Sequence, residues 1–475
     1  MRVPVPQHID PAASLGRVHF VGIGGAALSG LARIMVERGL TVTGSDAHSS
    51  TVLDSLRAVG ITCWVGHDAS QVDQADTVVV STAIRADNPE VARAREMGLR
   101  VWPRSAAVQS LLLGRTAIVV TGTHGKTTTT AMLTTALQAC GADPSYAIGS
   151  ALAASGVNAA DGSGSIFVVE GDESDAAILT YTPVGAVITN VDADHLDQYG
   201  TVAAYRDVFD AFLDRIQPDG FCVCCVDDPG AAHVADEARR RKITAVTVGQ
   251  GPQAMYRVAD ATFPGHTSTF EMWHGQDRLG TVSLVVPGLT SVLDAAAALV
   301  TGLHLGFAFG DLAAGLAEYA GSNRRMERKG SAGGVRVYDS YAHHPTEISA
   351  DLQAARAVAG SGRLIVCYQP HLYSRTRIFG AEMGAALGSA DEVVVMDVYA
   401  AREEPDPTVS GALVADAVPL GAEMVQYVAD RAATAAVVAA RSGSGDLVLT
   451  LGAGDVVDVG PEVLEILARG EAVTP

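Results

Sequence analysis

The stretch TAIVVTGTHGKTTTT, residues 116–130, decides how the middle of the chain folds. Its first six residues are an apolar run typical of a buried strand, and a helical pattern opens at the lysine. Between the two lies GxxGKT, whose glycines and lysine are typical of a loop that cradles phosphate with backbone N–H groups. The full GxxxxGK[ST] pattern has a further glycine at the position that Val120 occupies in this sequence. The stretch therefore predicts a strand, a phosphate-binding loop and a helix.

The lysine of this loop stands out in the composition. Lysine occurs three times, at 126, 242 and 329, among 33 basic residues, so chance is a poor explanation for Lys126. The 53 acidic residues leave a formal net charge of −20, which repels nucleic acid and anionic membranes. We therefore expect neither as a partner.

Two acidic clusters follow the next apolar runs along the chain. EGDESD at 170–175 comes after the run 165–169, and DADHLD at 192–197 comes after the run 185–190. In an open parallel sheet the carboxyl ends of the strands border the ligand crevice. Carboxylates beside a phosphate loop repel one another unless a divalent cation offsets them, so a magnesium site is expected. Capping and turn chemistry is the alternative interpretation.

Towards the amino terminus, the apolar run 17–22 leads into a second glycine turn. Residues 22–27 match GxGxxA, and Asp46 follows about twenty residues on, which is a dinucleotide-binding fingerprint. Such a turn also occurs where glycines merely allow tight packing of a helix on a strand. Alone it would suggest a nicotinamide dehydrogenase, but the phosphate loop weighs against that function.

Towards the carboxyl terminus, polar segments follow two further predicted strands. DSYAHHP at 339–345 and QPHLYSRTR at 369–377 both stand at strand-to-helix turns, with Pro345 suited to the first turn of a helix. Paired histidines with arginines could hold a small carboxylate. Both segments could instead be surface features.

The whole chain reads as three α/β domains. Its 475 residues exceed one ordinary domain about threefold. We expect a Rossmann-like domain at 1–112, a central P-loop ATPase-type domain at 113–319 and a Rossmann-like domain at 320–475. No apolar run reaches the ~18 residues of a membrane span, and the first residues do not resemble a signal peptide, so a cytoplasmic protein is expected. Cys222, Cys224 and Cys225 are expected in a buried strand rather than a metal site.

Together these segments resemble the Mur ligases, most closely the members that add L-alanine. The resemblance covers nearly the whole chain and rests on motifs from all three expected domains. They are HFVGIGGAALSG (19–30), GSD (44–46), STAI with NPE (81–90), TGTHGKTTT (121–129), EGDESD (170–175), TNVDADHLDQY (189–199), DSYAHHPTE (339–347), QPHLYSRT (369–376), DVYAAREEP (397–405) and LGAGD (451–455).

The resemblance implies ATP-dependent ligation of L-alanine to the carboxylate of UDP-N-acetylmuramate through an acyl phosphate, with ATP and Mg²⁺ as cofactors, in a monomer or homodimer. It assigns ATP binding to Gly122, Thr123, His124, Gly125, Lys126, Thr127, Thr128 and Asp339, and binding of the UDP-sugar to Gly22, Gly24, Gly25, Ser45, Asp46 and Ser81. It assigns amino-acid binding to Tyr341, His343, His371 and Arg375. Metal binding is assigned to Thr127, Glu170 and His195, and catalysis to Lys126, Glu170, His195 and Arg325.

Four residues depart from the family pattern. Thr290, Ser291 and Asp294 replace an HNxxN-type stretch whose asparagines border the adenine, and Leu372 stands where arginine is common. The carboxylate of Asp294 can only accept hydrogen bonds, so we expect weaker contacts to the adenine. Because Leu372 carries no charge, we expect Arg375 to bind the alanine carboxylate with less help. A non-catalytic UDP-sugar-binding relative with an impaired ATP site is the alternative function.

Overall fold

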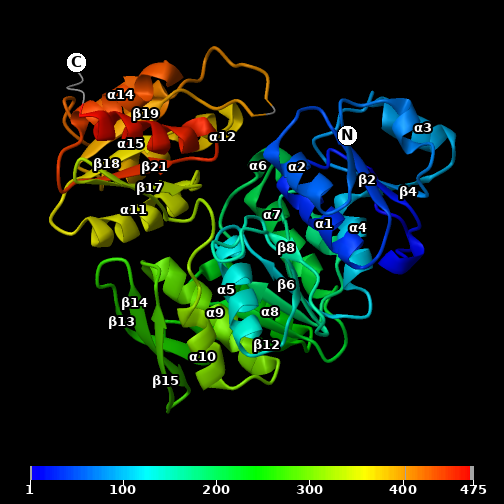
Figure 1. Ribbon diagram of the computed structural model, residues 1–475. Helices are drawn as coiled ribbons and strands as arrows, with labels where there is room; N and C mark the ends of the chain where they lie inside the picture. The colour runs from blue at the N-terminus through cyan, green and yellow to red at the C-terminus, as the bar shows by residue number, and fades with distance from the viewer. Residues whose placement is uncertain (1–2, 402, 471–475) are drawn as a thin grey trace. The chain divides into compact units, whose positions relative to one another are not determined.

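We describe the fold from a computed structural model, which describes residues 3–401 and 403–470. The strands form three sheets (Figure 1). The chain divides into two compact units. One comprises Met1–Val258, Met272–Gly280 and Asp294–Leu316, and the other comprises Ala259–Glu271, Thr281–Leu293 and Ala317–Pro475.

The first sheet has five parallel strands in the order β3-β2-β1-β4-β5. Its elements are η1 Ala12–Ser14, β1 Val18–Val21, α1 Ala26–Glu37, β2 Val42–Asp46, α2 Thr51–Ala58, β3 Thr62–Val65, η2 Ala69–Val72, β4 Thr77–Val80, α3 Pro89–Glu96, β5 Arg100–Pro103 and α4 Arg104–Leu112. Apolar side chains pack on both faces, Phe20 with Leu31 of α1 in one core and Val78 with Val91 of α3 in another. The apolar run at 17–22 is confirmed as a strand.

The central sheet has the order β15-β14-β13-β12-β11-β10-β6-β9-β7-β8. Its elements are β6 Thr116–Thr121, α5 Lys126–Ala139, β7 Ser145–Ala147, β8 Ala159–Ala160, β9 Ile166–Glu170, η3 Ala177–Thr180, β10 Gly185–Ile188, α6 Leu196–Tyr199, α7 Val202–Leu213, β11 Phe221–Cys225, α8 Pro229–Arg240, β12 Thr244–Gly249, β13 Tyr256–Thr262, β14 Ser268–His274, β15 Asp277–Leu284, α9 Leu289–His304 and α10 Phe309–Ala317. The parallel register pairs Val120 with Glu170 and Thr121 with Ile188. The carboxyl ends of β9 and β10 therefore flank the end of β6, as the sequence predicted.

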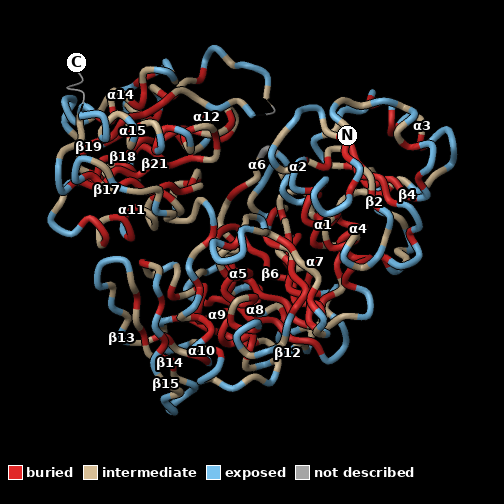
Figure 2. The backbone as a smooth tube through the Cα atoms, viewed as in Figure 1, coloured by how far each residue is buried: buried red, intermediate tan, exposed pale blue. Residues whose placement is uncertain are grey.

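The third sheet has the order β16-β17-β21-β18-β19-β20, with β16 antiparallel to β17 and the other neighbours parallel. Its elements are β16 Glu327–Ala332, β17 Val335–Ser340, α11 Pro345–Ala359, β18 Leu364–Tyr368, α12 Tyr373–Leu387, β19 Glu392–Met396, α13 Ala412–Ala415, β20 Val425–Val428, α14 Arg431–Arg441, β21 Leu447–Leu451, η4 Asp455–Asp458 and α15 Val459–Arg469. One core joins the sheet to α11 and α12, and another joins it to α14 and α15. Buried backbone marks the central strands in Figure 2.

The cysteine-rich segment is a buried strand, as expected. Cys222, Cys224 and Cys225 lie in β11, and their side chains are buried with free thiols. Among the described helices, none has the length and apolar character to cross a membrane.

Asp351 of α11 makes the stability of its domain depend on pH. Burial, together with the negative charge of Glu347, raises the pKa of Asp351 to about 6, although the Ser340 hydroxyl donates a hydrogen bond to it. Because the unfolded chain loses this proton at lower pH than the folded chain, folding is favoured below the unfolded pKa and loses that support as pH rises through about 6.

We expect Asp351→Asn to remove this loss, on the order of 2 kcal/mol between about pH 4 and pH 7. Calorimetric unfolding at both pH values measures it, and the unfolding temperature of the variant should gain on the wild type as pH rises. An unchanging difference between the two proteins would contradict the assignment.

Candidate functional site

The phosphate loop between β6 and α5 depends on two glycines. Gly125, directly before α5, has φ 79°, and Gly122 has φ 137°, a region that side-chain-bearing residues rarely adopt. A Cβ on Gly122 would also lie 2.1 Å from Thr189 Oγ1. Asn190, just beyond β10, holds the loop, since its Oδ1 accepts from His124 N at 2.8 Å and its carbonyl accepts from Thr123 N at 3.1 Å. Contacts within the protein therefore fix the shape of this loop.

Lys126 lies under this loop with its ammonium enclosed. Its Nζ donates to the carbonyls of Gly122 at 2.6 Å and Thr123 at 2.9 Å, and it pairs with Glu173 Oε2 at 2.9 Å. Burial is the largest single influence and alone lowers the pKa of Lys126, but the charges of Glu173 and Glu170 and the hydrogen bond to Glu173 together outweigh it and leave that pKa above its usual value. The lysine is therefore a fixed positive charge in the loop.

Glu173 is a site residue that sequence reasoning missed. Its side chain has no exposed surface, and its Oε1 lies 3.3 Å from His195 Nε2. Its carbonyl also accepts a short hydrogen bond from the hydroxyl of Tyr199. One carboxylate thus joins the lysine of the first motif to the histidine of the second acidic cluster. Spacing alone could not single it out among four acidic residues in EGDESD.

The residues expected to hold metal gather in the same region. Thr127 Oγ1 donates to Glu170 Oε2 at 2.9 Å, and that oxygen also accepts from Gly149 N at 2.7 Å. His195 adopts φ 53°, a strained conformation for a residue other than glycine, and it faces Glu173. A hydroxyl and a carboxylate are hard oxygen ligands that suit Mg²⁺, and the imidazole adds a nitrogen. The donor set fits a divalent cation.

Arg104, the first residue of α4, was also missed. Its Nη2 lies 2.8 Å from Asp172 Oδ2. Burial alone would raise the pKa of Asp172, but Arg104 and the hydrogen bonds from Ser174 bring it down to about 2. Asp172 is therefore an anion, and Arg104 offsets part of the charge of EGDESD.

The amino-terminal glycine turn is tied to the end of β2. The carbonyl of Ser45 accepts from Gly22 N at 2.8 Å and Ile23 N at 3.0 Å, and Asp46 Oδ2 accepts from Gly24 N at 2.9 Å. Ser45 has no exposed surface, and its side chain faces the interior of the domain. Ser81 follows β4 beside the turn, where a Cβ on Gly22 would lie 3.1 Å from it.

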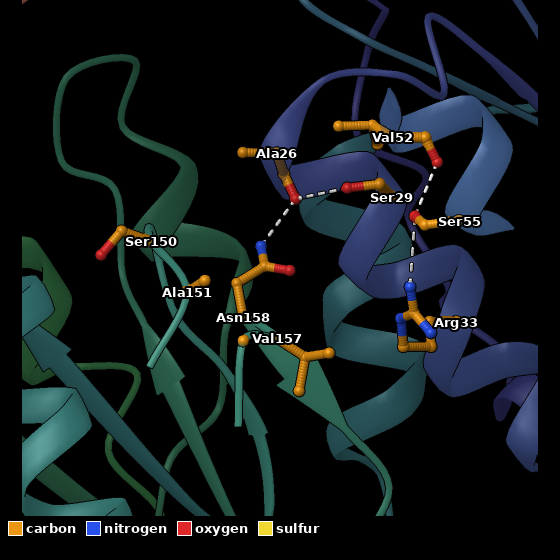
Figure 3. Close-up of a pocket in the computed structure, with 10 residues that line it drawn as sticks. Ala26, Ser29, Arg33, Val52, Ser55, Ser150, Ala151, Val157 and Asn158 are labelled. Carbon is orange, nitrogen blue, oxygen red and sulfur yellow. Dashed lines mark hydrogen bonds between the residues drawn. The ribbon is translucent and has the colours of Figure 1, made fainter. Parts of the chain in front are cut away.

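A cavity of about 220 Å³ opens beside α1. Ala26, the first residue of this helix and the neighbour of Gly25, belongs to its lining. Its lining comes from α1, α2 and the segment 150–158, as Figure 3 shows. Arg33 on α1 reaches Ser55 on α2 at 3.5 Å, and Asn158 Nδ2 donates to the carbonyl of Ala26 at 2.9 Å. Hydroxyl, amide and guanidinium groups therefore converge next to the glycine turn.

Four residues expected at the amino acid meet in the third sheet's domain. The rings of Tyr341 and His343 lie 5.4 Å apart, those of His343 and His371 lie 6.0 Å apart, and Arg375 Nη1 is 3.5 Å from His371 Nδ1. Two segments separated by a strand and a helix in sequence therefore form one cluster. Arg375 is mostly buried.

Two arginines and Asp339 adjoin this cluster. The guanidinium groups of Arg324 and Arg325 lie 5.0 and 5.6 Å from the ring centre of Tyr341. Asp339 is fully buried, and its carboxylate accepts from Arg324 Nε at 3.1 Å and Thr450 Oγ1 at 2.7 Å. A ribose could reach it only if these partners moved.

The departures from the family pattern are built into the fold. On α9, Thr290 and Ser291 lie in the first turn, and Ser291 Oγ donates to the carbonyl of Pro287 at 2.8 Å. Asp294 is buried and accepts from Thr129 Oγ1 at 2.9 Å, and a Cβ on Gly125 would lie 2.5 Å from its Oδ1. Leu372 has φ 69° and a buried side chain.

Comparison with known proteins matches all three parts of the chain. The family models described as "Mur ligase family, catalytic domain", "Mur ligase middle domain" and "Mur ligase, glutamate ligase domain" match residues 17–116, 120–302 and 324–454. The UDP-N-acetylmuramate–L-alanine ligase of Nocardioides sp. (strain ATCC BAA-499 / JS614) is 60% identical over 98% of this chain and 100% of its own length. That of Kineococcus radiotolerans is 52% identical, covering 99% and 100%.

Among solved structures, the UDP-N-acetylmuramate–alanine ligase of Thermotoga maritima superposes with a TM-score of 0.80 at 27% identity, covering 98% of this chain and 100% of that one. A murein peptide ligase of Psychrobacter arcticus shares the fold, with a TM-score of 0.70 at 22% identity over 96% and 99% of the two chains. With the three-sheet architecture and the phosphate loop, these matches lead to one conclusion: the chain belongs to the Mur ligase family.

Proposed function

We propose that this protein ligates L-alanine to the carboxylate of UDP-N-acetylmuramate, a step of peptidoglycan synthesis, with cleavage of ATP to ADP and phosphate. The observation that carries the proposal is the 60% identity, over the full length, to a ligase named for this reaction. ATP and a UDP-sugar are cytoplasmic metabolites, so we propose a cytoplasmic enzyme. We also propose the boundaries 1–112, 113–319 and 320–475 for its domains.

The proposed chemistry has two steps. A muramate carboxylate oxygen attacks the γ-phosphorus of ATP, the bond to the β,γ-bridging oxygen breaks, and ADP leaves. The alanine amine then attacks the acyl carbon, inorganic phosphate leaves and the nitrogen loses a proton. Phosphoryl transfer between polyanions needs positioning and neutralised charge more than a nucleophile from the protein. Lys126, held as a cation in the phosphate loop, supplies one such charge.

The remaining roles follow the geometry of the clusters. Thr127, Glu170 and His195 would hold Mg²⁺, which supplies charge neutralisation for the triphosphate when it is bound. The paired rings of His343 and His371 beside Arg375 suit the carboxylate and amine of a small amino acid. Arg325 is proposed near the transferred phosphate. The non-catalytic alternative gains no support, because the residues of the phosphate loop and of EGDESD are in contact.

We expect Lys126→Ala to abolish ADP formation, a loss of at least ~100-fold, because the γ-phosphate loses its fixed cation. Binding of UDP-N-acetylmuramate should stay within about twofold by calorimetry, since the sugar nucleotide is assigned to the first domain. Lys242→Ala, at an exposed lysine after α8, is the matched control. Loss of sugar-nucleotide binding from folded Lys126→Ala would contradict the division between domains.

We expect Glu170→Gln and His195→Gln each to raise the Mg²⁺ concentration needed for half-maximal activity, because each removes a ligand. Magnesium titrations of phosphate release measure this effect. Asp175→Asn, in the same acidic cluster, is the control and should leave the titration near wild type. If neither ligand variant shifts the midpoint, these residues serve only turn and capping roles.

The altered α9 predicts weak binding of ATP. Asp294 places a carboxyl group behind the phosphate loop, and neither it nor Ser291 offers an asparagine amide to a base. Restoring Ser291→Asn with Asp294→Asn should lower the KM for ATP roughly five- to thirtyfold, the worth of one or two hydrogen bonds. Comparing ATP with GTP before and after restoration is the measurement. Tight, strictly ATP-selective turnover by the unmodified chain would refute this prediction.

A further inference from the structure

Glu90 is a buried carboxylate that lies outside the clusters assigned to ligation. It stands in the first turn of α3, within the NPE segment, and has no exposed surface. The hydroxyl of Ser45 donates to its Oε2 at 2.7 Å, and His67 Nδ1 lies 3.2 Å from the same oxygen. His19 Nε2, also buried, lies 3.7 Å from Oε1. The two motifs HFVGIGG and NPE thus meet in the interior of the first domain.

Stability of α3 does not account for this carboxylate. Asn88 already caps the helix, with its Oδ1 accepting from the backbone N–H of Glu90 at 3.0 Å and of Val91 at 3.2 Å. Taking a carboxylate out of water is costly, and apolar side chains of similar size often replace buried charges without loss of stability. We therefore attribute the glutamate at position 90 to its polar contacts. The shortest of these joins the carboxylate of Glu90 to the hydroxyl of Ser45.

Ser45 connects Glu90 to the glycine turn. Its side chain binds the carboxylate, while its carbonyl accepts from Gly22 N and Ile23 N. The next residue, Asp46, accepts from Gly24 N. The preceding residue is packed against the same turn, since a Cβ on Gly44 would lie 2.5 Å from Ile23 Cδ1. Any movement of Ser45 therefore moves the N–H groups of the turn.

We propose that Glu90 is a positioning residue for the nucleotide-sugar diphosphate. By fixing the Ser45 hydroxyl, it holds the N–H groups of residues 22–25 at the start of α1 in the arrangement that a diphosphate needs. The inference rests on the proposed function, because it takes the sugar nucleotide as the ligand of this turn. Glu90 itself does not contact the ligand.

Binding of UDP-N-acetylmuramate by Glu90→Ala and Glu90→Gln tests the proposal. Loss of the acceptor in Glu90→Ala should raise the calorimetric Kd about tenfold, the effect of losing one hydrogen bond to a charged group. Glu90→Gln keeps an oxygen for the Ser45 hydroxyl and should recover most of the affinity. Ser45→Ala should match Glu90→Ala, and the double variant should be no worse. The KM for ATP should not change in any of them.

Thr77→Val is the control for a general loss of stability. Thr77 is buried at the amino end of β4, and its hydroxyl donates to the carbonyl of Leu15 at 2.8 Å, away from the glycine turn. The thermal unfolding midpoint of Thr77→Val should fall, while its Kd for UDP-N-acetylmuramate should stay at the wild-type value. An unchanged Kd in Glu90→Ala, or an equal rise in Thr77→Val, would overturn the inference.

The proposed function is tested separately by phosphate release in the wild type. A chain that binds the sugar nucleotide but releases no phosphate with L-alanine and ATP refutes the ligase function and leaves the role of Glu90 decided by the binding data. A wild-type chain that does not bind UDP-N-acetylmuramate refutes both.

Discussion

The buried ion pair between Lys126 and Glu173 organises the central site. An ammonium enclosed by loop carbonyls needs a counter-charge, and Glu173 supplies it from the loop after β9. The same carboxylate faces His195 from the loop after β10. Three strand ends are therefore joined by one anion, and their order in the sheet follows from the parallel register of β9, β6 and β10. A triphosphate entering the loop must compete with this anion for the lysine.

Much of the fold could be predicted from the sequence because parallel strands buried on both faces are continuous apolar runs. Residues 116–121 and 335–339 have this form, and both are strands. Strands β13 to β15, at one end of the central sheet, were missed because they alternate polar and apolar residues and lie partly exposed. Strand β2 was missed because it is rich in polar residues, and β3 was missed because it has only four residues.

The site was predictable only where the chemistry lies within one segment. Lys126 and Thr127 stand in a recognisable loop, and the acidic clusters follow apolar runs. Contacts such as Glu90 with Ser45 depend on the three-dimensional path of the chain, and nothing in the local sequence distinguishes a glutamate that faces inward from one that caps a helix. The family resemblance assigned Ser45 to the sugar nucleotide, and that assignment stays a prediction; the structure adds that its side chain is buried.

The ion pair of Arg104 with Asp172 limits which segments of related proteins can be joined in a chimera. Arg104 is the first residue of α4, the helix that follows the last strand of the first sheet. Asp172 lies in the loop after β9, and its carboxylate pairs with Arg104. A chimera that joined the first 112 residues of a relative to the rest of this chain would keep the half-buried Asp172 paired only if the donor carried arginine at the matching position. Without it, an unpaired anion would remain beside the phosphate loop. The segments that carry Arg104 and Asp172 must therefore come from the same protein or from matched relatives, although they belong to different sheets.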